Sequence, residues 1–228
     1  MLRLYKSYLY CKAPNHFKSL LYSLSVTAKN MNYLAHAYLS FNEPAIVTGN
    51  MISDFVKGKK KFDFSTPVQK GIALHRAIDE FTDFHPVTQI AKAYFKKDYR
   101  LYSGAFVDVL YDHFLANDTT AFADEAQLNA FCQVTYAILQ SNVSNMPANF
   151  LLVLPSMQQH NWLYNYRYKA GIDKSFAGLV RRAAYLTDSA PAYATFNQYY
   201  KELGECYQSF FPELKNFAFQ HLRQLNNS

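Results

Sequence analysis

The chain has 228 residues, of which 50% are apolar and 17% aromatic, with seven glycines, so it can form one sizeable core without needing a second domain. The formal net charge of +6 arises mainly in residues 1–30, which contain five basic side chains and no acidic one. The remaining 18 basic and 17 acidic groups nearly balance, so the composition excludes a general nucleic-acid-binding surface.

Residues 1–30 have three interpretations. A secretory signal is one, but the apolar segment at 20–26 is short, serines interrupt it, and no clear cleavage site follows. An organellar transit segment is the second, because the stretch is basic and free of acid. The third, which we favour, is a dispensable leader upstream of a start at Met31, where amphipathic patterning begins. We therefore predict a poorly ordered leader at 1–30 and one domain at 31–228.

Two further features bear on location. No stretch reaches the roughly 20 apolar residues that a membrane span requires. The three cysteines, Cys11, Cys132 and Cys206, are odd in number and far apart, which suggests neither a disulfide framework nor a zinc site and fits a reducing cytoplasm.

From Met31 onward the sequence predicts a series of helices, because glycine is scarce and valine and isoleucine seldom alternate with polar residues. Gly58, His85-Pro86 and Phe211-Pro212 are the expected breaks. The expected fold is an all-α, single-domain helical bundle. The predicted helices are 32–41, 44–56, 71–83 (with a cap and proline start at 65–67), 87–97, 101–117, 124–140, 147–159, 172–186, 192–210 and 212–225.

The helix at 71–83 organises the others. Its residues His75, Asp79 and Asp83 are spaced four apart, which puts them on one stripe beside the apolar face. Polar groups in that position need either a metal ion or buried hydrogen-bond partners. Asp83 could also be only a partner that orients a ligating histidine.

Four of the early helices carry polar groups at this spacing, and His113 directly follows the last pair. A single histidine near an apolar face is usually a hydrogen-bonded core residue, and a single aspartate is often a cap or ion-pair partner. Four pairs together favour a metal site between the early helices, and mixed imidazole and carboxylate ligands suit Mn²⁺, Fe or Zn²⁺. The pairs are Asn32/His36, Asn50/Asp54, His75/Asp79 and Asp108/Asp112.

These segments resemble the acyl carrier protein phosphodiesterase family, a divergent all-helical branch of the HD phosphohydrolase superfamily. The similarity covers nearly the whole chain after Met31. It is carried by MNYLAHAYLS at 31–40, GNMISDFVKG at 49–58, GIALHRAIDEFTD at 71–83, DVLYDHFL at 108–115 and YYKELGECYQSFFPEL at 199–214.

The resemblance implies an HD-domain-like fold and hydrolysis of holo-acyl carrier protein to the apo protein and 4′-phosphopantetheine. It also implies a divalent metal, typically Mn²⁺, with Mg²⁺ or Fe²⁺ as alternatives. Asp54, His75 and Asp112 carry over as the metal-binding core, with His36 and Asp79 as further ligands. The sequence departs from a standard HD motif, because its adjacent pair runs Asp112-His113 and Arg76 follows His75.

Two residues have predicted catalytic roles beside the metal. Arg76 offers a planar fork that could neutralise charge on two phosphoryl oxygens. The alternative for Arg76 is an ion pair with Asp79 or Glu80 on its own helix. The departing serine alkoxide needs a proton, and His113 or His36 could supply it.

The basic run after Asp54 is a candidate docking site for the acidic carrier protein, because electrostatic attraction raises association rates. The alternative is a solvated loop that keeps the protein soluble. The residues are Lys57, Lys59, Lys60 and Lys61.

Two other functions fit the same sequence. One is an HD-type hydrolase acting on a nucleotide or other small phosphoester without a protein substrate. The other is a non-enzymatic helical protein that binds a metal or a partner.

Overall fold

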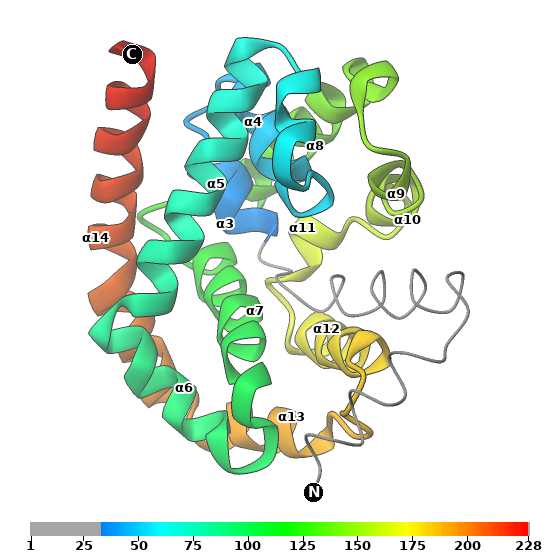
Figure 1. Cartoon of the computed structure of the whole chain (residues 1–228). Helices are drawn as coiled ribbons and strands as arrows, with labels where there is room; N and C mark the ends of the chain where they lie inside the picture. The colour runs from blue at the N-terminus through cyan, green and yellow to red at the C-terminus, as the bar shows by residue number, and fades with distance from the viewer. Residues whose placement is uncertain (1–32, 228) are drawn as a thin grey trace, which may run out of the picture.

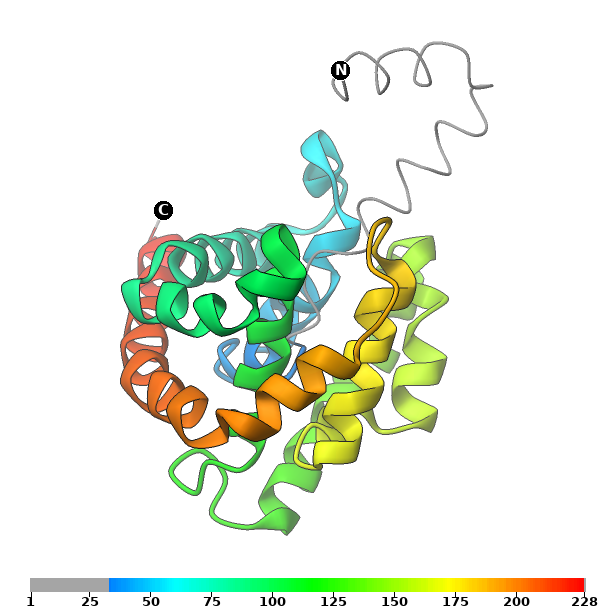
Figure 2. The same cartoon turned by 90° about the horizontal axis from the view of Figure 1, so that it is seen from below.

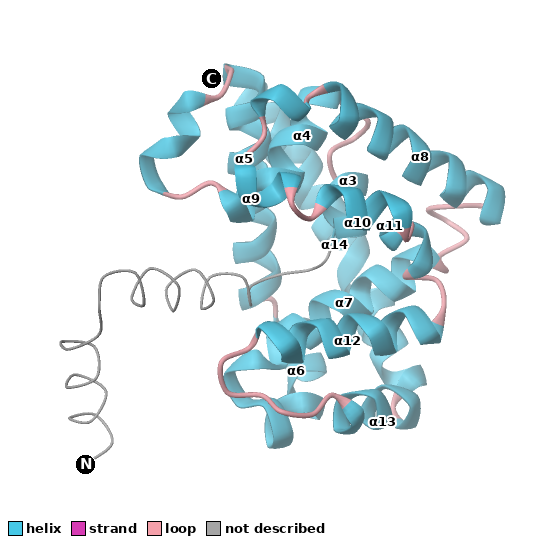
Figure 3. Ribbon diagram, turned by 90° about the vertical axis from the view of Figure 1, so that its right-hand side faces the viewer, coloured by secondary structure: helices cyan, strands magenta, loops and turns pink. Residues whose placement is uncertain are grey.

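The computed structural model describes residues 33–227, which form helices and connecting loops and contain no strand (Figure 3). The all-α prediction is confirmed for this range. The predicted leader at 1–30 and Asn32 lie outside the described residues. The first eight helical elements are α3 (Tyr33–Tyr38), α4 (Pro44–Ile52), η1 (Ser53–Phe55), η2 (Gly58–Asp63), α5 (Thr66–Phe84), α6 (Pro86–Tyr99), η3 (Arg100–Tyr102) and α7 (Ser103–Ala116). The others are α8 (Glu125–Ser141), η4 (Val143–Asn145), α9 (Ala148–Leu151), α10 (Leu154–Gln159), α11 (Trp162–Asn165), α12 (Lys169–Arg182), α13 (Ala190–Gln198) and α14 (Tyr200–Asn227).

Helix α5 begins and ends where its sequence indicates. Pro67 lies in its first turn, where a missing N–H has no cost, and His85 precedes Pro86 in an extended conformation. Ile72, Leu74 and Ile78 are fully buried. The buried face of α5 packs mainly against α4 and α14.

Two glycines allow α4 and α5 to cross at very short range. A Cβ atom placed on Gly71 would lie 2.9 Å from Cα of Gly49 and 3.0 Å from Cα of Ile46. A Cβ atom on Gly49 would in turn lie 2.9 Å from Cα of Gly71. Backbone therefore meets backbone at this crossing, and only residues without a side chain fit there. The crossing places the end of α4 and the η1 turn beside the middle of α5.

Helix α7 lies inside the bundle. Every side chain from Phe106 to Ala116 is buried, and α6 and α12 pack on either side of the helix (Figure 2). A helix that is buried on all sides is expected to be apolar all round. Asp108, Asp112 and His113 are exceptions, so each of them needs a specific partner.

The C-terminal helix differs from its prediction. A break at Phe211-Pro212 is wrong, because Pro212 lies within the 28-residue helix α14, which runs alongside α5 and α6 (Figure 1). Pro212 is on the exposed face, where water can hydrate the carbonyl group that its missing N–H leaves unpaired. The buried stripe continues across the proline from Phe210 to Leu214. The actual break falls at Tyr199, between α13 and α14.

Some other boundaries also shift. The predicted helix 147–159 is two short helices, α9 and α10, and Pro155 fits the first turn of the second. The predicted helix 172–186 is α12, which ends at Arg182 where the chain becomes extended at Ala183. The first helix ends at Tyr38, three residues early, and Phe41 and Asn42 adopt positive φ angles. Among residues 33–227, no helix is both long and apolar enough to cross a lipid bilayer.

Candidate metal centre

Two histidines and one carboxylate meet between α3 and α5. His36 is on α3, and His75 and Asp79 are one turn apart on α5. Nε2 of His36 lies 3.2 Å from Oδ1 of Asp79, and Nε2 of His75 lies 3.3 Å from Oδ2 of the same carboxylate. One potential ligand atom from each residue lies within 4.8 Å of the other two. We call these three residues the His–His–Asp group.

Asp54 adds a second carboxylate at the edge of this group. It is on the η1 turn, and its Oδ1 lies 3.4 Å from Nε2 of His75. The side chains of Asp54 and Asp79 are each 23% exposed, whereas those of His36 and His75 are 2% and 6% exposed. A substrate can therefore reach the group from its carboxylate side.

Asn50 fixes the orientation of His75. Its amide Nδ2 donates hydrogen bonds to the His36 carbonyl oxygen at 3.0 Å and to Ser40 Oγ at 3.1 Å. Its Oδ1 is then the acceptor for Nδ1 of His75, 3.1 Å away. A neutral His75 with its proton on Nδ1 has a lone pair on Nε2, directed at Asp54 and Asp79. This is the tautomer that a metal-binding imidazole needs.

The nitrogens of the two histidines are buried without adequate partners. Nδ1 and Nε2 of His36 and Nε2 of His75 have no hydrogen bond of acceptable geometry within the described residues, although carboxylate oxygens lie nearby. The two rings also stack, with centroids 3.9 Å apart and planes inclined by 17°. Unsatisfied buried polar atoms are costly. A divalent cation between the imidazoles and the carboxylate would satisfy the two Nε2 atoms, so the residues present fit a metal ion.

The pKa values of the group follow from the same geometry. Burial lowers the pKa of His75, but the charge of Asp79 and contacts with Asp54 outweigh it and raise this pKa to about 10. Burial and the charge of His75 lower the pKa of His36. Burial raises the pKa of Asp79, but the charge of His75 reverses this and leaves it below its ordinary value. Without a metal, one proton on His75 thus takes the place of the cation, and an ion displaces that proton when it binds.

Asp112 was predicted as a core ligand, and the structure does not bring it into the His–His–Asp group. Its Oδ1 accepts a 2.7 Å hydrogen bond from the N–H of Ala35, and its Oδ2 a 3.0 Å bond from that of Leu34. These N–H groups belong to the first turn of α3, where a helix has no internal partners for them. Asp112 therefore ties α3 to α7 and fixes the position of His36. Metal binding by Asp112 stays a prediction.

His113 directly follows Asp112 on α7 and is buried, and its side chain contacts other elements. Its Nδ1 lies 2.7 Å from the carbonyl oxygen of Tyr166, and its Nε2 lies 3.0 Å from the hydroxyl of Tyr200. Both ring nitrogens are thus in contact with protein atoms. Burial also lowers the pKa of His113, which favours the neutral ring. Its predicted role as a proton donor remains a prediction.

The predicted charged residues at the surface lie near η1. Arg76 is exposed, and its Nη2 donates a 3.0 Å hydrogen bond to the carbonyl oxygen of Val56, not to the carboxylates of Asp79 or Glu80. The basic run at 57–61 begins at Lys57, directly before η2, and continues into it; Lys57, Lys59 and Lys60 are exposed. Nζ of Lys61 lies 5.0 Å from the centre of the Phe62 ring. The basic run follows the metal-binding residue candidate Asp54 closely in sequence, and Arg76 reaches the same segment through its hydrogen bond to Val56.

The last polar residues do not join the His–His–Asp group. Asp83 accepts a 2.9 Å hydrogen bond from Nζ of Lys92, so it does not orient a histidine. Asp108 is buried, and burial together with the charges of Asp79 and Asp83 raises its pKa well above the ordinary value. The Asp108/Asp112 pair of α7 thus lies outside the His–His–Asp group, and its role at the centre stays a prediction.

The sequence prediction gave Asn50 no place among the site residues. The sequence feature that could have identified Asn50 is its position directly after Gly49 and four residues before Asp54. Its function depends on a tertiary contact with α5, which spacing within one helix does not show. The same holds for Ser40, whose Oγ accepts from Asn50 and donates to the carbonyl oxygen of His36.

The fold and site define a class of protein: an all-α domain with a histidine–carboxylate centre between facing helices, where bundles hold their metal ions. Residues 31–214 match the acyl carrier protein phosphodiesterase family. The chain belongs to this family.

Individual relatives agree with the family match. The acyl carrier protein phosphodiesterase of Yersinia pestis is 30% identical over 191 residues, covering 84% of this chain and 98% of the relative. The protein of the same name from Yersinia enterocolitica is 28% identical, covering 82% and 97%. That from Salmonella agona is 28% identical, covering 81% and 95%. No solved structure matches the chain.

Proposed function

We propose that this protein is a metal-dependent phosphodiesterase that removes 4′-phosphopantetheine from holo-acyl carrier protein and leaves the apo protein. The relatives are named for this activity. The observation that carries the proposal is that Nε2 of His36 and Nε2 of His75, both buried and without a hydrogen bond of acceptable geometry, lie beside the carboxylate of Asp79. This donor set suits a divalent ion more than it suits a packed core.

His36, His75 and Asp79 would hold the ion, and Asp54 would be the fourth ligand. We infer Mn²⁺, with Mg²⁺ or Fe²⁺ as alternatives, because two carboxylates accompany the two imidazoles. When bound, a divalent ion supplies Lewis-acid chemistry, lowering the pKa of water and neutralising charge on phosphoryl oxygens.

The residues of the chain supply positioning and charge. Asn50 keeps the His75 proton on Nδ1, so that Nε2 stays available as a ligand. Arg76 uses one N–H group on Val56 and has others left for the phosphoryl oxygens. Asp54 lies at the open side of the group, where its second carboxylate oxygen can accept a hydrogen bond from the attacking water.

The proposal also places the protein in the cytoplasm. The described cysteines, Cys132 and Cys206, are unpaired thiols, which is usual in a reducing compartment.

The reaction can be followed by the intact mass of the carrier protein. With Mn²⁺ present, we expect holo-acyl carrier protein to lose the mass of phosphopantetheine and to become the apo form. A chelator and Asp54→Ala should each abolish the loss, whereas the exposed control Asp98→Ala should leave it unchanged. An unchanged carrier protein in the presence of metal-loaded enzyme would contradict the proposal.

The basic run at 57–61 provides a second test of the proposed function, because acyl carrier proteins are acidic. We propose that Lys57, Lys59, Lys60 and Lys61 attract the carrier protein toward Asp54. Reversing all four to glutamate should raise KM for holo-acyl carrier protein and reduce its salt dependence, because steering depends on charge. Hydrolysis of bis(p-nitrophenyl) phosphate, a small diester, should change little.

The matched control for charge reversal is Lys96→Glu with Lys97→Glu, on the exposed end of α6. If both substrates lose activity equally in the η2 variant, or if the α6 variant raises KM as much, the docking role is wrong.

A further inference from the structure

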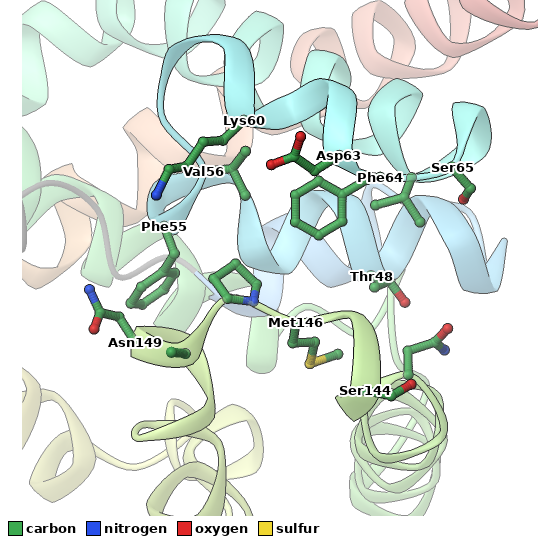
Figure 4. Close-up of a pocket in the computed structure, with 14 residues that line it drawn as sticks. Thr48, Phe55, Val56, Lys60, Asp63, Phe64, Ser65, Ser144, Met146 and Asn149 are labelled. Atoms are coloured by element: carbon green, nitrogen blue, oxygen red, sulfur yellow. The ribbon is translucent and has the colours of Figure 1, made fainter.

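A cavity of about 600 Å³ lies next to the metal-binding residue candidate Asp54. One wall comes from the segment that contains η1 and η2, and the other from residues 142–149, which join α8 to α9 (Figure 4). This volume is within the range of small-molecule sites in proteins. The lining residues are Thr48, Phe55, Val56, Lys60, Asp63, Phe64, Ser65, Val68, Asn142, Ser144, Met146, Pro147, Ala148 and Asn149.

The cavity and the His–His–Asp group share one short piece of backbone. Asp54 approaches His75, and the next two residues, Phe55 and Val56, line the cavity. Consecutive Cα atoms are about 3.8 Å apart, so a molecule bound in the cavity lies within a few residues of the metal centre. Arg76 binds the carbonyl oxygen of Val56 and so stands at the junction of the two.

The chemistry of the lining is neutral and mixed. Apolar side chains, including Phe55, Phe64 and Met146, alternate with hydroxyl and amide groups, and the only charged residues are Lys60 and Asp63, which have opposite signs. Such a lining does not favour a polyanion. It suits a flexible neutral chain that has methyl and methylene groups between amide bonds.

Two of the polar groups are available to a ligand. The side chains of Ser144 and Asn149 make no hydrogen bond within the described residues, and both face the cavity from the same segment. Asn142 donates its Nδ2 to the carbonyl oxygen of Ile138 at 2.8 Å, which leaves its Oδ1 as an acceptor. Donors and acceptors are therefore present for amide groups.

We propose that this cavity binds the pantetheine arm of the prosthetic group while the phosphodiester lies at the His–His–Asp group. The inference rests on the proposed function. Beyond its phosphate, the arm is uncharged and carries a dimethyl-substituted carbon, a hydroxyl group, two amides and a thiol, in keeping with the lining of the cavity. The cavity thus selects the part of the substrate that stays attached to the phosphate, and the basic run at 57–61 attracts the carrier protein, whose serine is the leaving group.

The test fills the cavity without touching the metal residues. Ala148→Trp adds a large side chain at an exposed position in the lining, and Ala130→Trp adds the same side chain at an exposed position on α8. Ala148→Trp should lower kcat/KM for holo-acyl carrier protein by about tenfold or more. It should leave hydrolysis of bis(p-nitrophenyl) phosphate unchanged, and Ala130→Trp should change neither activity. Equal kcat/KM values for the two variants with the carrier protein would overturn the inference.

Calorimetry with pantetheine, which has no phosphate, tests the cavity without catalysis. The wild-type protein and Ala130→Trp should bind pantetheine, and Ala148→Trp should not. Absence of binding to the wild type, or equal binding to all three proteins, would overturn the inference. If pantetheine binds as expected but the carrier protein is not hydrolysed, the proposed reaction fails and the cavity assignment stands.

Discussion

Replacing His75 by alanine should remove both metal binding and hydrolysis. Nε2 of His75 faces two carboxylates: it lies 3.3 Å from Oδ2 of Asp79 and 3.4 Å from Oδ1 of Asp54. Loss of a partner outside the ligand shell typically weakens metal affinity about 10- to 100-fold, and loss of the ligand itself should exceed that. Titration with Mn²⁺ and the mass assay with holo-acyl carrier protein measure the two effects.

Thermal unfolding separates this effect from simple loss of stability. An ion at 100 times its dissociation constant should stabilise the wild type by about 2.7 kcal/mol, a rise in Tm of about 5–11 °C for a chain of this size. His75→Ala should show no such rise, and the exposed control His160→Ala should show all of it. If a folded His75→Ala protein showed the full rise in Tm when the ion is added, the metal would bind at another site.

Replacing Gly71 by alanine should cause a large loss of stability for a substitution that adds one methyl group. The new Cβ would lie 2.9 Å from Cα of Gly49 and 3.0 Å from Cα of Ile46, and the backbone of α4 cannot yield as a side chain can. Overpacking of this kind costs about 3 kcal/mol, which corresponds to a fall in Tm of about 6–12 °C. Urea unfolding gives the free energy directly.

The control is Gly104→Ala on α7. Its Cβ would meet Cε of Lys92 at 3.2 Å, the flexible end of a side chain, so the contact can relax. Because alanine favours a helix over glycine by about 1 kcal/mol, Gly104→Ala should be neutral or stabilising. Gly71→Ala should also weaken metal binding, since separating α4 from α5 moves Asn50 and Asp54 away from His75. A Gly71→Ala protein as stable as Gly104→Ala would contradict the tight crossing.

Local sequence features predicted the parts of the site that lie within one element. The spacing of His75 and Asp79 places both on one face of α5, and Pro67 and Pro86 mark its ends, as the structure confirms. Asp54 was also expected near this helix, and the η1 turn brings it to His75.

The other parts of the site and fold depend on contacts between elements that are far apart in the sequence, and local features do not predict these contacts. Asp108 and Asp112 have the same spacing as His75 and Asp79, but the carboxylate of Asp112 meets the N-terminus of α3, which is 77 residues away from it at Ala35. Nothing in the sequence of α7 distinguishes a carboxylate that binds a helix end from one that binds a metal. Pro212 is a similar case, because a proline on the solvent face of a long helix is compatible with a buried stripe that continues on either side.

The bond between Asp112 and the start of α3 also sets the order in which the centre can form. The proposed ligands His36, Asp54, His75 and Asp79 have all been made when the ribosome reaches Asp112, which follows His36 by 76 residues. The start of α3 is fixed only when α7 has been made and its carboxylate accepts the N–H groups of Leu34 and Ala35. The final geometry of the centre therefore requires that the N-terminal and central parts of the protein have packed together.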